Sequence, residues 1–559
     1  MAVIKMDWQK NLLVAAILAT LLLLVIRWHE YQEKLPTQPV AAAQTANTGN
    51  TSSDAPVVVA NGEIPAAANS LPEATKAPEA TQAVISVKTD SLDVEINTYG
   101  GDIVQVALPR HYAKLDTPDQ PYVLLNNRDN HTYIAQSGLV GNNGTDTAQG
   151  RPVFSSEKQQ YQLIDGQDQL QVDLVLQQGE VKITKRFTFK RGEYLVKVEY
   201  LIDNQSGAPW SAQLYGQIKR DSQNFVKVSA LEMNPFLGAA ITTNEENYKK
   251  FTFANIAESE FKTTRQGGWV AMVQHYFISA WIPDASSDNT YSLRKLGAND
   301  LYLLGFTGKV NEVAAGQQGS FSANFYAGPK DTKQLESISP HLELTVDYGW
   351  LWWLSKPLFL VMKFIHDLVG NWGLAIIGLI VLIKAIFFKL SATSYKSMAK
   401  MRKLGPKLAE MKERYGDDRQ KFSQEMMKLY KTEKVNPFGG CLPLLIQMPV
   451  FLAFYYVLME SVELRHAPFV GWITDLSVKD PWFVLPIIYG ITMWFMQKLN
   501  PQPTDPMQAR IMQMLPIVFT IMFLWFPAGM VLYWVTNNLL SIAQQYVITK
   551  QIENADTSK

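Results

Sequence analysis

The sequence contains a single cysteine, Cys441, among 559 residues. One cysteine excludes an internal disulfide framework and any cysteine-based zinc site. The chain also lacks a Gly-rich loop ending in Gly-Lys-Ser or Gly-Lys-Thr, so ATP is not the expected energy source. It has no His-Glu-x-x-His and no Gly-x-Ser-x-Gly motif, and its seven histidines are scattered. We therefore expect no metal, no cofactor and no catalytic residues.

The sequence also lacks an overall charge of one sign, since 51 Lys and Arg balance 51 Asp and Glu. The total charge therefore indicates no specific nucleic-acid partner. The basic residues are unevenly spread, however, because residues 391–437 hold twelve Lys and Arg against six Asp and Glu. Cytoplasmic loops of membrane proteins carry such an excess, which predicts that this segment lies in the cytoplasm.

The amino-terminal region predicts a membrane anchor over residues 1–34. Its apolar run, 11–26, has lysines before it and Arg27 directly after it. A cleaved signal peptide has the same outline, but no small-x-small cleavage site follows the run. The pattern favours an uncleaved anchor with its amino end in the cytoplasm. Residues 35–83, rich in Ala, Pro, Thr, Asn and Ser, predict a flexible linker.

Residues 84–345 have a period of two, which is typical of strands with one buried face. Apolar and polar side chains alternate over 170–176 and over 181–189 (VKITKRFTF), and turn signals such as Asp165-Gly166 separate such runs. The pattern predicts an all-β sandwich. Because no apolar span interrupts it, we expect the whole domain on the opposite side of the membrane from the amino terminus.

Apolar runs with helical spacing dominate the chain beyond residue 345. Residues 346–370 combine three tryptophans near their start with a polar stripe that contains Lys356 and Lys363, which predicts an amphipathic helix in the outer membrane interface. Five membrane spans are predicted after it: 372–391, 440–460, 482–497, 510–527 and 529–549.

With the anchor, these spans predict an α-helical integral membrane bundle of six transmembrane helices beside the β sandwich. The five-helix core covers residues 371–549. Within it, 392–438 predicts a cytoplasmic hairpin of two amphipathic helices, in which a glycine ends the first helix and an aspartate caps the second. A short tail, 550–559, follows. Both termini are then expected in the cytoplasm.

Lys384 lies inside the apolar run 372–390, where a membrane span should carry no charge. A cation near mid-membrane costs about 2.5–3.5 kcal/mol on insertion scales, and such residues usually face a bundle interior or a wet cavity. Polar residues follow one stripe of the last span, 529–549, and a further polar residue lies in the span 440–460. The set predicts a hydrophilic groove that opens to the cytoplasm, formed by Lys384, Gln447, Trp534, Asn537, Ser541, Gln544 and Gln545. Polar residues that only join membrane helices would give the same pattern.

The span predicted over 510–527 carries no charge at residues 511–526. Fourteen of the nineteen methionines fall between 398 and 530. Flexible thioether side chains suit a surface that accepts many apolar sequences. We expect a hydrophobic slide beside the groove, with Phe451, Met514, Phe519 and Met522 as its residues. Ordinary lipid-facing packing is the alternative.

Two long motifs resemble the YidC/Oxa/Alb family of membrane-protein insertases. The first is NPFGGCLP at 436–443 followed by LIQMPVF at 445–451. The second, GGWVAM at 267–272 with the residues that follow it to Pro283, resembles the large periplasmic domain of the Gram-negative branch. The resemblance covers essentially the whole chain. It implies a multi-pass protein of the bacterial inner membrane that inserts and helps to fold nascent membrane proteins, alone or with the Sec translocon.

The resemblance also implies roles for individual residues. Lys384 matches a groove cation that is usually arginine in the family, so this chain keeps the charge but loses the planar fork of donors. Trp534 matches an aromatic residue that faces the substrate and is commonly tyrosine. The expected partners are nascent membrane proteins, the Sec translocon with its accessory subunits, and the lipid bilayer. Ribosome docking is weakly supported, since Lys550 in the short tail is offset by Glu553.

Two other functions compete with this interpretation. A solute channel or transporter would usually show internal repeats of spans, and none is seen. A glycan-acting periplasmic enzyme would need a pair of catalytic carboxylates, and no convincing pair stands out among the scattered acidic residues.

Overall fold

The computed structural model describes residues 83–557 except 129–130, 149, 225–234, 416–417, 434, 436–441 and 501–505. The predicted anchor and almost all of the predicted linker lie outside these residues, as does most of the first family motif, NPFGGC at 436–441. The described residues belong to one compact unit of the chain.

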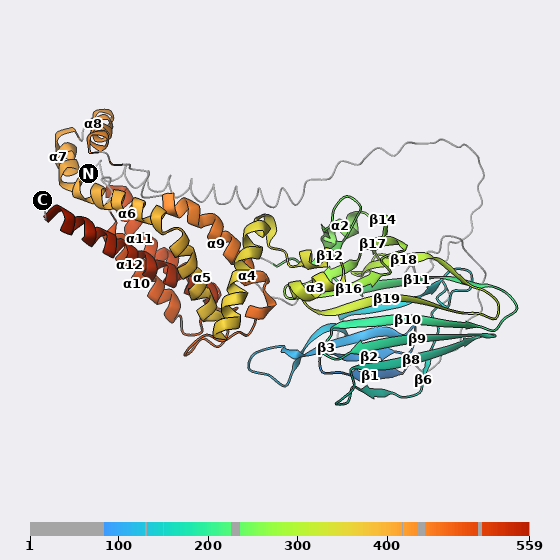
Figure 1. Ribbon diagram of the computed structural model, residues 1–559. Helices are drawn as coiled ribbons and strands as arrows, with labels where there is room; N and C mark the ends of the chain where they lie inside the picture. Colours follow the sequence, from blue (N-terminus) through green and yellow to red (C-terminus); the bar gives the residue numbers. More distant parts are fainter. Residues whose placement is uncertain are drawn as a thin grey trace, which may run out of the picture. The chain divides into compact units, whose positions relative to one another are not determined.

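The predicted β sandwich is confirmed as a large domain of two mainly antiparallel sheets (Figure 1). In the described part of the chain, the first sheet has the order β14-β17-β18-β11-β5-β4-β3-β2-β1-β7. Its strands are β1 Val84–Lys88, β2 Asp93–Asn97, β3 Asp102–Tyr112, β4 Pro121–Arg128, β5 His131–Val140, β7 Gln160–Gln162, β11 Trp210–Arg220, β14 Phe261–Gln266, β17 Asp288–Lys295 and β18 Tyr302–Val313.

The second sheet has the order β13-β12-β15-β16-β19-β10-β9-β8-β6. Side chains cross from one sheet to the other: the Tyr133 hydroxyl lies 2.7 Å from the Ser279 hydroxyl, and Trp281 Nε1 donates to the Gln217 carbonyl over 3.1 Å. Its strands are β6 Ser155–Ser156, β8 Gln169–Gln178, β9 Val181–Lys190, β10 Leu195–Asn204, β12 Gly238–Ile241, β13 Lys249–Phe251, β15 Val270–Val273, β16 Phe277–Pro283 and β19 Gln318–Pro329.

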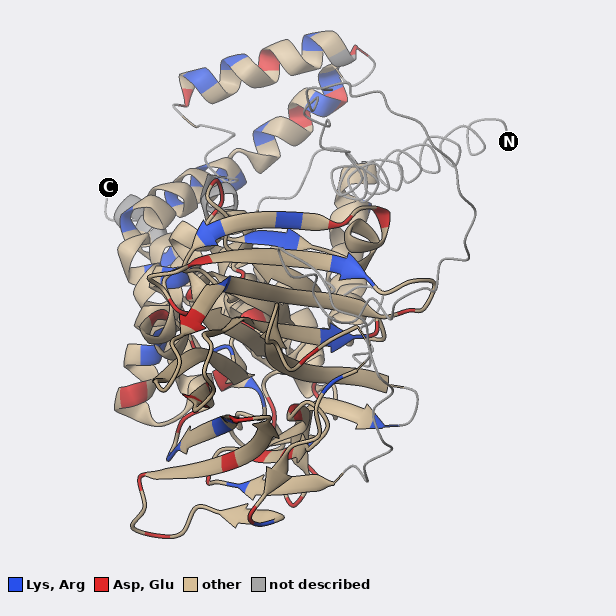
Figure 2. Ribbon diagram, turned by 90° about the vertical axis from the view of Figure 1, so that its right-hand side faces the viewer, with Lys and Arg blue, Asp and Glu red and all other residues tan. Residues whose placement is uncertain are grey.

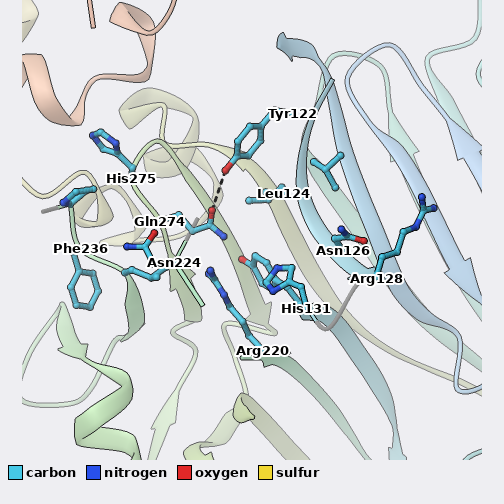
Figure 3. A pocket seen from close by; sticks show the side chains of 14 residues that line it. Tyr122, Leu124, Asn126, Arg128, His131, Arg220, Asn224, Phe236, Gln274 and His275 are labelled. Atoms are coloured by element: carbon cyan, nitrogen blue, oxygen red, sulfur yellow. Dashed lines mark hydrogen bonds between the residues drawn. The ribbon is translucent and has the colours of Figure 1, made fainter. Parts of the chain in front are cut away.

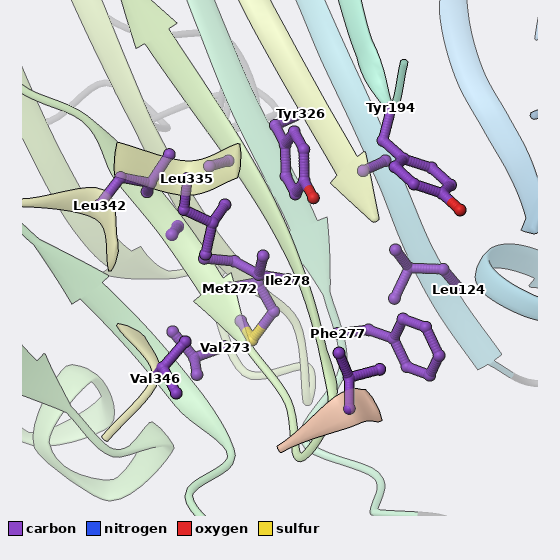
Figure 4. Close-up of a cluster of buried hydrophobic side chains, with 14 of the residues drawn as sticks. Leu124, Tyr194, Met272, Val273, Phe277, Ile278, Tyr326, Leu335, Leu342 and Val346 are labelled. Carbon is purple, nitrogen blue, oxygen red and sulfur yellow. The ribbon is translucent and has the colours of Figure 1, made fainter. Parts of the chain in front are cut away.

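Alternation along the strands builds the core of the sandwich. In β10, Val196, Val198, Tyr200 and Ile202 are buried on one face, as a period of two requires. At one end of the domain, side chains from β15, β16 and β19 pack with those of the short helix α3 (Thr332–Ile338) and the residues after it (Figure 4). This packing links the end of the last strand to the helical region.

A charged cluster lies inside the sandwich. The Arg151 guanidinium contacts Asp102 through Nη1 and Asp146 through Nε, each over 2.5 Å. Lys185, fully buried in β9, donates from Nζ to the carbonyls of Gly100 and Ser137 over 2.9 and 3.0 Å. Burial lowers the pKa of Lys185 to about 7. The cluster joins β3 of one sheet to β9 of the other.

The helical region begins after the sandwich. Apart from α2 (Phe253–Glu258) and α3, the described α-helices are α4 Trp352–Val369, α5 Trp372–Ile386, α6 Phe388–Lys403, α7 Gly405–Tyr415, α8 Arg419–Thr432, α9 Leu442–Glu460, α10 Val484–Leu499, α11 Pro506–Phe523 and α12 Ala528–Thr557. By length and composition, no one helix within the described ranges would cross a membrane alone. The helices α5 and α6, which meet at a bend of 70°, are together long and apolar enough for a membrane span.

Two boundaries differ from the expected spans. The span predicted over 372–391 is interrupted at Phe387, whose N–H bonds to the carbonyls of Ile383 and Ala385. The last helix continues to Thr557, well beyond the span that the apolar pattern predicts, because the residues after 549 are polar but include no glycine or proline that would end it.

In the described residues, the predicted hairpin, 392–438, contains the end of α6, then α7 and α8, so the single helix expected before Gly416 is divided at Leu404. The Asp418 side chain accepts hydrogen bonds from the N–H groups of Gln420 and Lys421, so the predicted aspartate cap of the second helix is confirmed. The glycine expected to end the first helix, Gly416, lies outside the described residues. Leu404, Leu408 and Val435 form a small apolar cluster of their own. Lys and Arg lie along both helices, at the top of Figure 2.

Candidate functional site

Lys384 lies in the last turn of α5, a helix that begins at an N-cap in which Asn371 accepts a hydrogen bond from the Leu374 N–H. Its side chain is only 6% exposed. Nζ donates to the Ser541 hydroxyl of α12 over 2.8 Å, and that hydroxyl donates in turn to the Asn537 carbonyl over 2.7 Å. Of the carboxylates in the described ranges, none forms an ion pair with Lys384. The cation is therefore held by a neutral hydroxyl.

Polar groups from two more helices, α9 and α10, continue this contact. Gln447 of α9 donates to the Asn537 side-chain oxygen over 2.7 Å. Asn538 donates to the Thr492 hydroxyl of α10 over 3.2 Å. Gln545 donates to the Leu499 carbonyl at the end of α10 over 3.0 Å. The polar stripe of α12 thus meets polar groups from α5, α9 and α10.

A cavity of about 200 Å³ lies along this stripe. Among the predicted groove residues, Gln447, Trp534, Asn537, Ser541 and Gln545 line it. Lys384 does not line the cavity but reaches it through Ser541. Gln544 is half-buried and lies outside the lining. The structure therefore brings five of the seven predicted groove residues together and places Lys384 directly behind them.

Two residues of the cavity lining carry unsatisfied polar atoms. The indole Nε1 of Trp534 and the side-chain oxygen of Gln545 are buried and have no hydrogen-bond partner in the part of the chain that the structure describes. Each such atom costs about 1–3 kcal/mol unless it is paired. A polar ligand or a bound water would satisfy them, so the cavity suits a polar guest.

One wall of the cavity is aromatic. The Phe451 and Trp534 rings lie with their centroids 4.7 Å apart, and Trp534 also contacts Tyr489 and Phe523 at 6.3 and 6.2 Å. The site therefore combines hydrogen-bonding groups on one side with a rigid apolar surface on the other, which suits a chain segment of mixed polarity.

The four predicted slide residues lie in different environments. Phe451 lines the cavity, while Phe519 and Met522 are half-buried and pack against the main core. Met514 of α11 is 51% exposed. The exposed apolar face of α11 carries Met514 together with Ile511, Ile517, Val518 and Ile521.

Sequence patterns did not reveal several residues of the lining. Tyr395 and Met398 come from α6 and reach the cavity after the bend at Phe387, which the continuous apolar run conceals. Asn538 lies beside the predicted Asn537 but one position off the polar stripe. A search for any amide in the last span would have found Asn538; no sequence signal points to Tyr395 or Met398.

Comparison with known families divides the chain into two matched parts. Residues 84–361 match the family model described as the YidC periplasmic domain. Residues 364–555 match the model described as a 60Kd inner membrane protein. The boundary falls within α4, between the sandwich and the remaining helices.

Two relatives match over nearly their entire length, and both are named membrane protein insertase YidC. The protein from Cellvibrio japonicus is 71% identical over 99% of this chain and 100% of its own. The protein from Saccharophagus degradans is 53% identical over 98% and 100%, respectively. A solved structure entitled "Active YidC insertase crystal structure with the first transmembrane domain resolved" covers 83% of this chain and 94% of that chain at 18% identity and a TM-score of 0.37, which supports no conclusion about geometry. On its sequence, the chain belongs to the YidC family of membrane protein insertases.

Proposed function

We propose that this chain inserts nascent proteins into the bacterial inner membrane, alone or with the Sec translocon, and helps them to fold. The observation that carries the proposal is the buried Lys384 ammonium, which donates to a hydroxyl and pairs with no carboxylate of the described residues. A cation in that state attracts a polar or acidic segment more strongly than one already paired, because buried charges are poorly screened.

The polar flank of an incoming segment enters the recess in this mechanism. Its carbonyls or carboxylates exchange hydrogen bonds with Gln447, Asn537 and Ser541, so that Lys384 gains an anionic or carbonyl partner in place of the hydroxyl. These groups sit on α9 and α12 rather than on loops, so the arrangement is preorganised. No covalent step is involved.

The apolar part of the segment supplies the driving force. The exposed apolar residues of α11 offer it a surface next to lipid, and its transfer from water is worth about 25 cal/mol per Å² of apolar area. The insertase then lowers a barrier rather than coupling insertion to a fuel. We assign the slide to Phe451 and the outward face around Met514, with Phe519 and Met522 supporting it from behind.

Helix length supports a thinned bilayer at the groove. Helix α10 has 16 residues, which is about 24 Å at 1.5 Å per residue, against a hydrocarbon core of about 30 Å. Such a mismatch thins the bilayer locally or exposes helix ends to water. A thinner barrier beside a polar recess eases the passage of a hydrophilic segment.

The proposed topology has six spans, with both termini and the basic hairpin in the cytoplasm and the sandwich in the periplasm. The excess of Lys and Arg over residues 391–437 supports this orientation. Residues 1–34 would be the anchor, 35–83 the linker, 346–370 the interfacial helix and 371–549 the core. In this arrangement the hairpin first meets nascent chains, and the sandwich is available to Sec components.

Photo-crosslinking tests the proposal directly. A photoreactive residue at position 447 or 534 should crosslink to a stalled nascent membrane protein, and the same probe at the exposed position 389 should not. Crosslinks confined to 389, or flux of a small solute through liposomes that contain the protein, would contradict the assignment of the recess to nascent chains.

A further inference from the structure

A second cavity, of about 370 Å³, lies in the β domain (Figure 3). Its wall is formed by β4, by the beginning of β5, by the end of β11 and by residues next to β12 and β15. Tyr122 and Gln274 face each other across it, with the Tyr122 hydroxyl donating to the Gln274 side-chain oxygen over 3.3 Å. This cavity is separate from the recess between the helices, with which it shares no lining residue.

Arg220, the last residue of β11, is the unusual group in this cavity. Its side chain is 3% exposed, and its guanidinium carbon lies 4.5 Å from the centre of the Tyr133 ring. Nη2 donates to the Gln223 carbonyl over 3.2 Å. Nε and Nη1 are buried and have no hydrogen-bond partner among the described residues. A buried guanidinium with unused donors is costly unless a ligand accepts from it.

The charged groups around Arg220 are occupied by other contacts. The Asp221 carboxylate accepts from His131 Nδ1 over 2.8 Å, from the Thr132 N–H over 2.7 Å and from the Gln223 N–H over 3.0 Å. Arg128, on the cavity wall, pairs with Glu95 over 3.1 Å. Burial lowers the pKa of Arg220, and an anion in the cavity would offset that penalty.

The remaining wall restricts what the anion can be. The side-chain oxygen of Asn126 is buried without a partner in the described part of the chain, so it offers an acceptor. Phe236 and Leu124 provide apolar surface. The volume lies within the range of sites for small organic ligands. Arginine suits planar oxyanions best.

We propose that this cavity binds a small organic carboxylate that also carries a hydrogen-bond donor, such as an N-acylated amino acid or the last residue of a peptide. The carboxylate accepts from Arg220, the donor bonds to Asn126, and the organic part lies against Phe236. This site is independent of the insertion groove.

Ligand-observed NMR titration of the full chain in nanodiscs tests the proposal with N-acetylglycine. N-acetylglycinamide, which has the same skeleton without the charge, and inorganic phosphate serve as comparison probes. We expect saturable binding of N-acetylglycine, at least tenfold weaker binding of the amide, and at least tenfold weaker binding of N-acetylglycine by Arg220→Met. Arg186→Met is the matched control, because Arg186 pairs with Asp173 on β8 over 2.7 Å, outside the cavity. Its affinity should equal that of the wild type.

Equal affinity for acid and amide, or no saturable binding of the acid, would overturn the proposal. Phosphate binding that requires Arg220 while N-acetylglycine does not bind would overturn the carboxylate assignment. If Arg220→Met does not fold, Asn126→Asp decides: a negative charge on the wall should weaken binding at least tenfold, and unchanged affinity refutes the site.

Discussion

Lys330, directly after β19, donates from Nζ to the Glu460 carboxylate at the end of α9 over 2.5 Å, and both side chains are almost fully buried. The His275 ring contacts the Met459 carbonyl over 2.7 Å beside this pair. The last strand of the sandwich and the end of a core helix are thus joined by a charge pair removed from water.

We expect Lys330→Met and Glu460→Gln each to destabilise the protein by about 3–5 kcal/mol, since each leaves one buried charge unpaired. The double variant should be markedly more stable than the sum of the two single effects predicts. The melting temperature of the full chain in detergent measures this, with a drop of about 10 °C for each single change. Lys250→Met is the control, because its pair with Asp347 is partly exposed and should contribute less than about 1 kcal/mol. Equal, small shifts in all the single variants would refute a structural role for the buried pair.

Lys384→Ala should slow membrane-protein insertion about tenfold or more, because it removes the charge that attracts the polar flank, and a loss of about 1.4 kcal/mol is already a factor of ten. Lys384→Arg should retain activity, since the charge is kept. Complementation of cells depleted of the native protein, followed by pulse-labelled insertion of a client, measures both. Lys389→Ala provides the matched control: that lysine is exposed, and insertion should be unaffected. Wild-type insertion by Lys384→Ala would show that the groove cation is dispensable.

Trp534→Phe should retain most insertion activity and lose less stability than Trp534→Ala, because an aromatic ring still contacts Phe451 while the unpaired Nε1 and part of the indole volume are lost. Trp534→Ala should destabilise the protein by about 3–5 kcal/mol through the space it leaves beside Phe451 and Phe523. The two variants are compared by thermal unfolding and by crosslinking to a nascent chain. If Trp534→Phe lost its crosslinks while remaining folded, the indole N–H would be required for substrate contact.

The stability of the sandwich should depend on pH through Lys185. Its folded pKa, about 7, lies below the usual value of 10.5, so between pH 7 and about 10.5 the unfolded chain binds the extra proton. Stability from this group therefore rises as pH increases through that window and is lowest below pH 7. In Lys185→Met this dependence should disappear. Arg151 Nη2 also donates to the carbonyls of Gly100 and Ser137, so both acceptors stay paired in the variant.

Melting curves of wild type and Lys185→Met at pH 6, 8 and 10 test this dependence. The melting temperature of the wild type should rise relative to that of the variant as pH increases. A constant difference between the two proteins across that range would mean that Lys185 does not titrate near neutrality in the folded state.

Much of the fold could be predicted from the sequence because its signals are local. Alternation over 181–189 predicts β9, and the same parity places Lys185 on the buried face among Val181, Ile183 and Phe187. The charged cluster around Arg151 could not be predicted, because its members come from strands far apart in the chain. The cavity at Arg220 was missed for the same reason.

The groove could be predicted where the residues within a single helix give a local signal. A cation in an apolar run and a polar stripe at helical spacing identify Lys384, Asn537 and Ser541. The contribution of α6 depends on the bend at Phe387, and no proline or glycine in the sequence signals that bend.

That bend has an electrostatic consequence for the groove. In an unbroken helix, Lys384 would sit mid-way along a row of paired peptide groups. Because α5 stops at Ile386, Lys384 instead lies in the last turn of a helix, whose carbonyl end carries about half a negative charge. The backbone thus partly neutralises a cation that has no carboxylate beside it, and straightening this joint would remove that compensation without altering a single side chain.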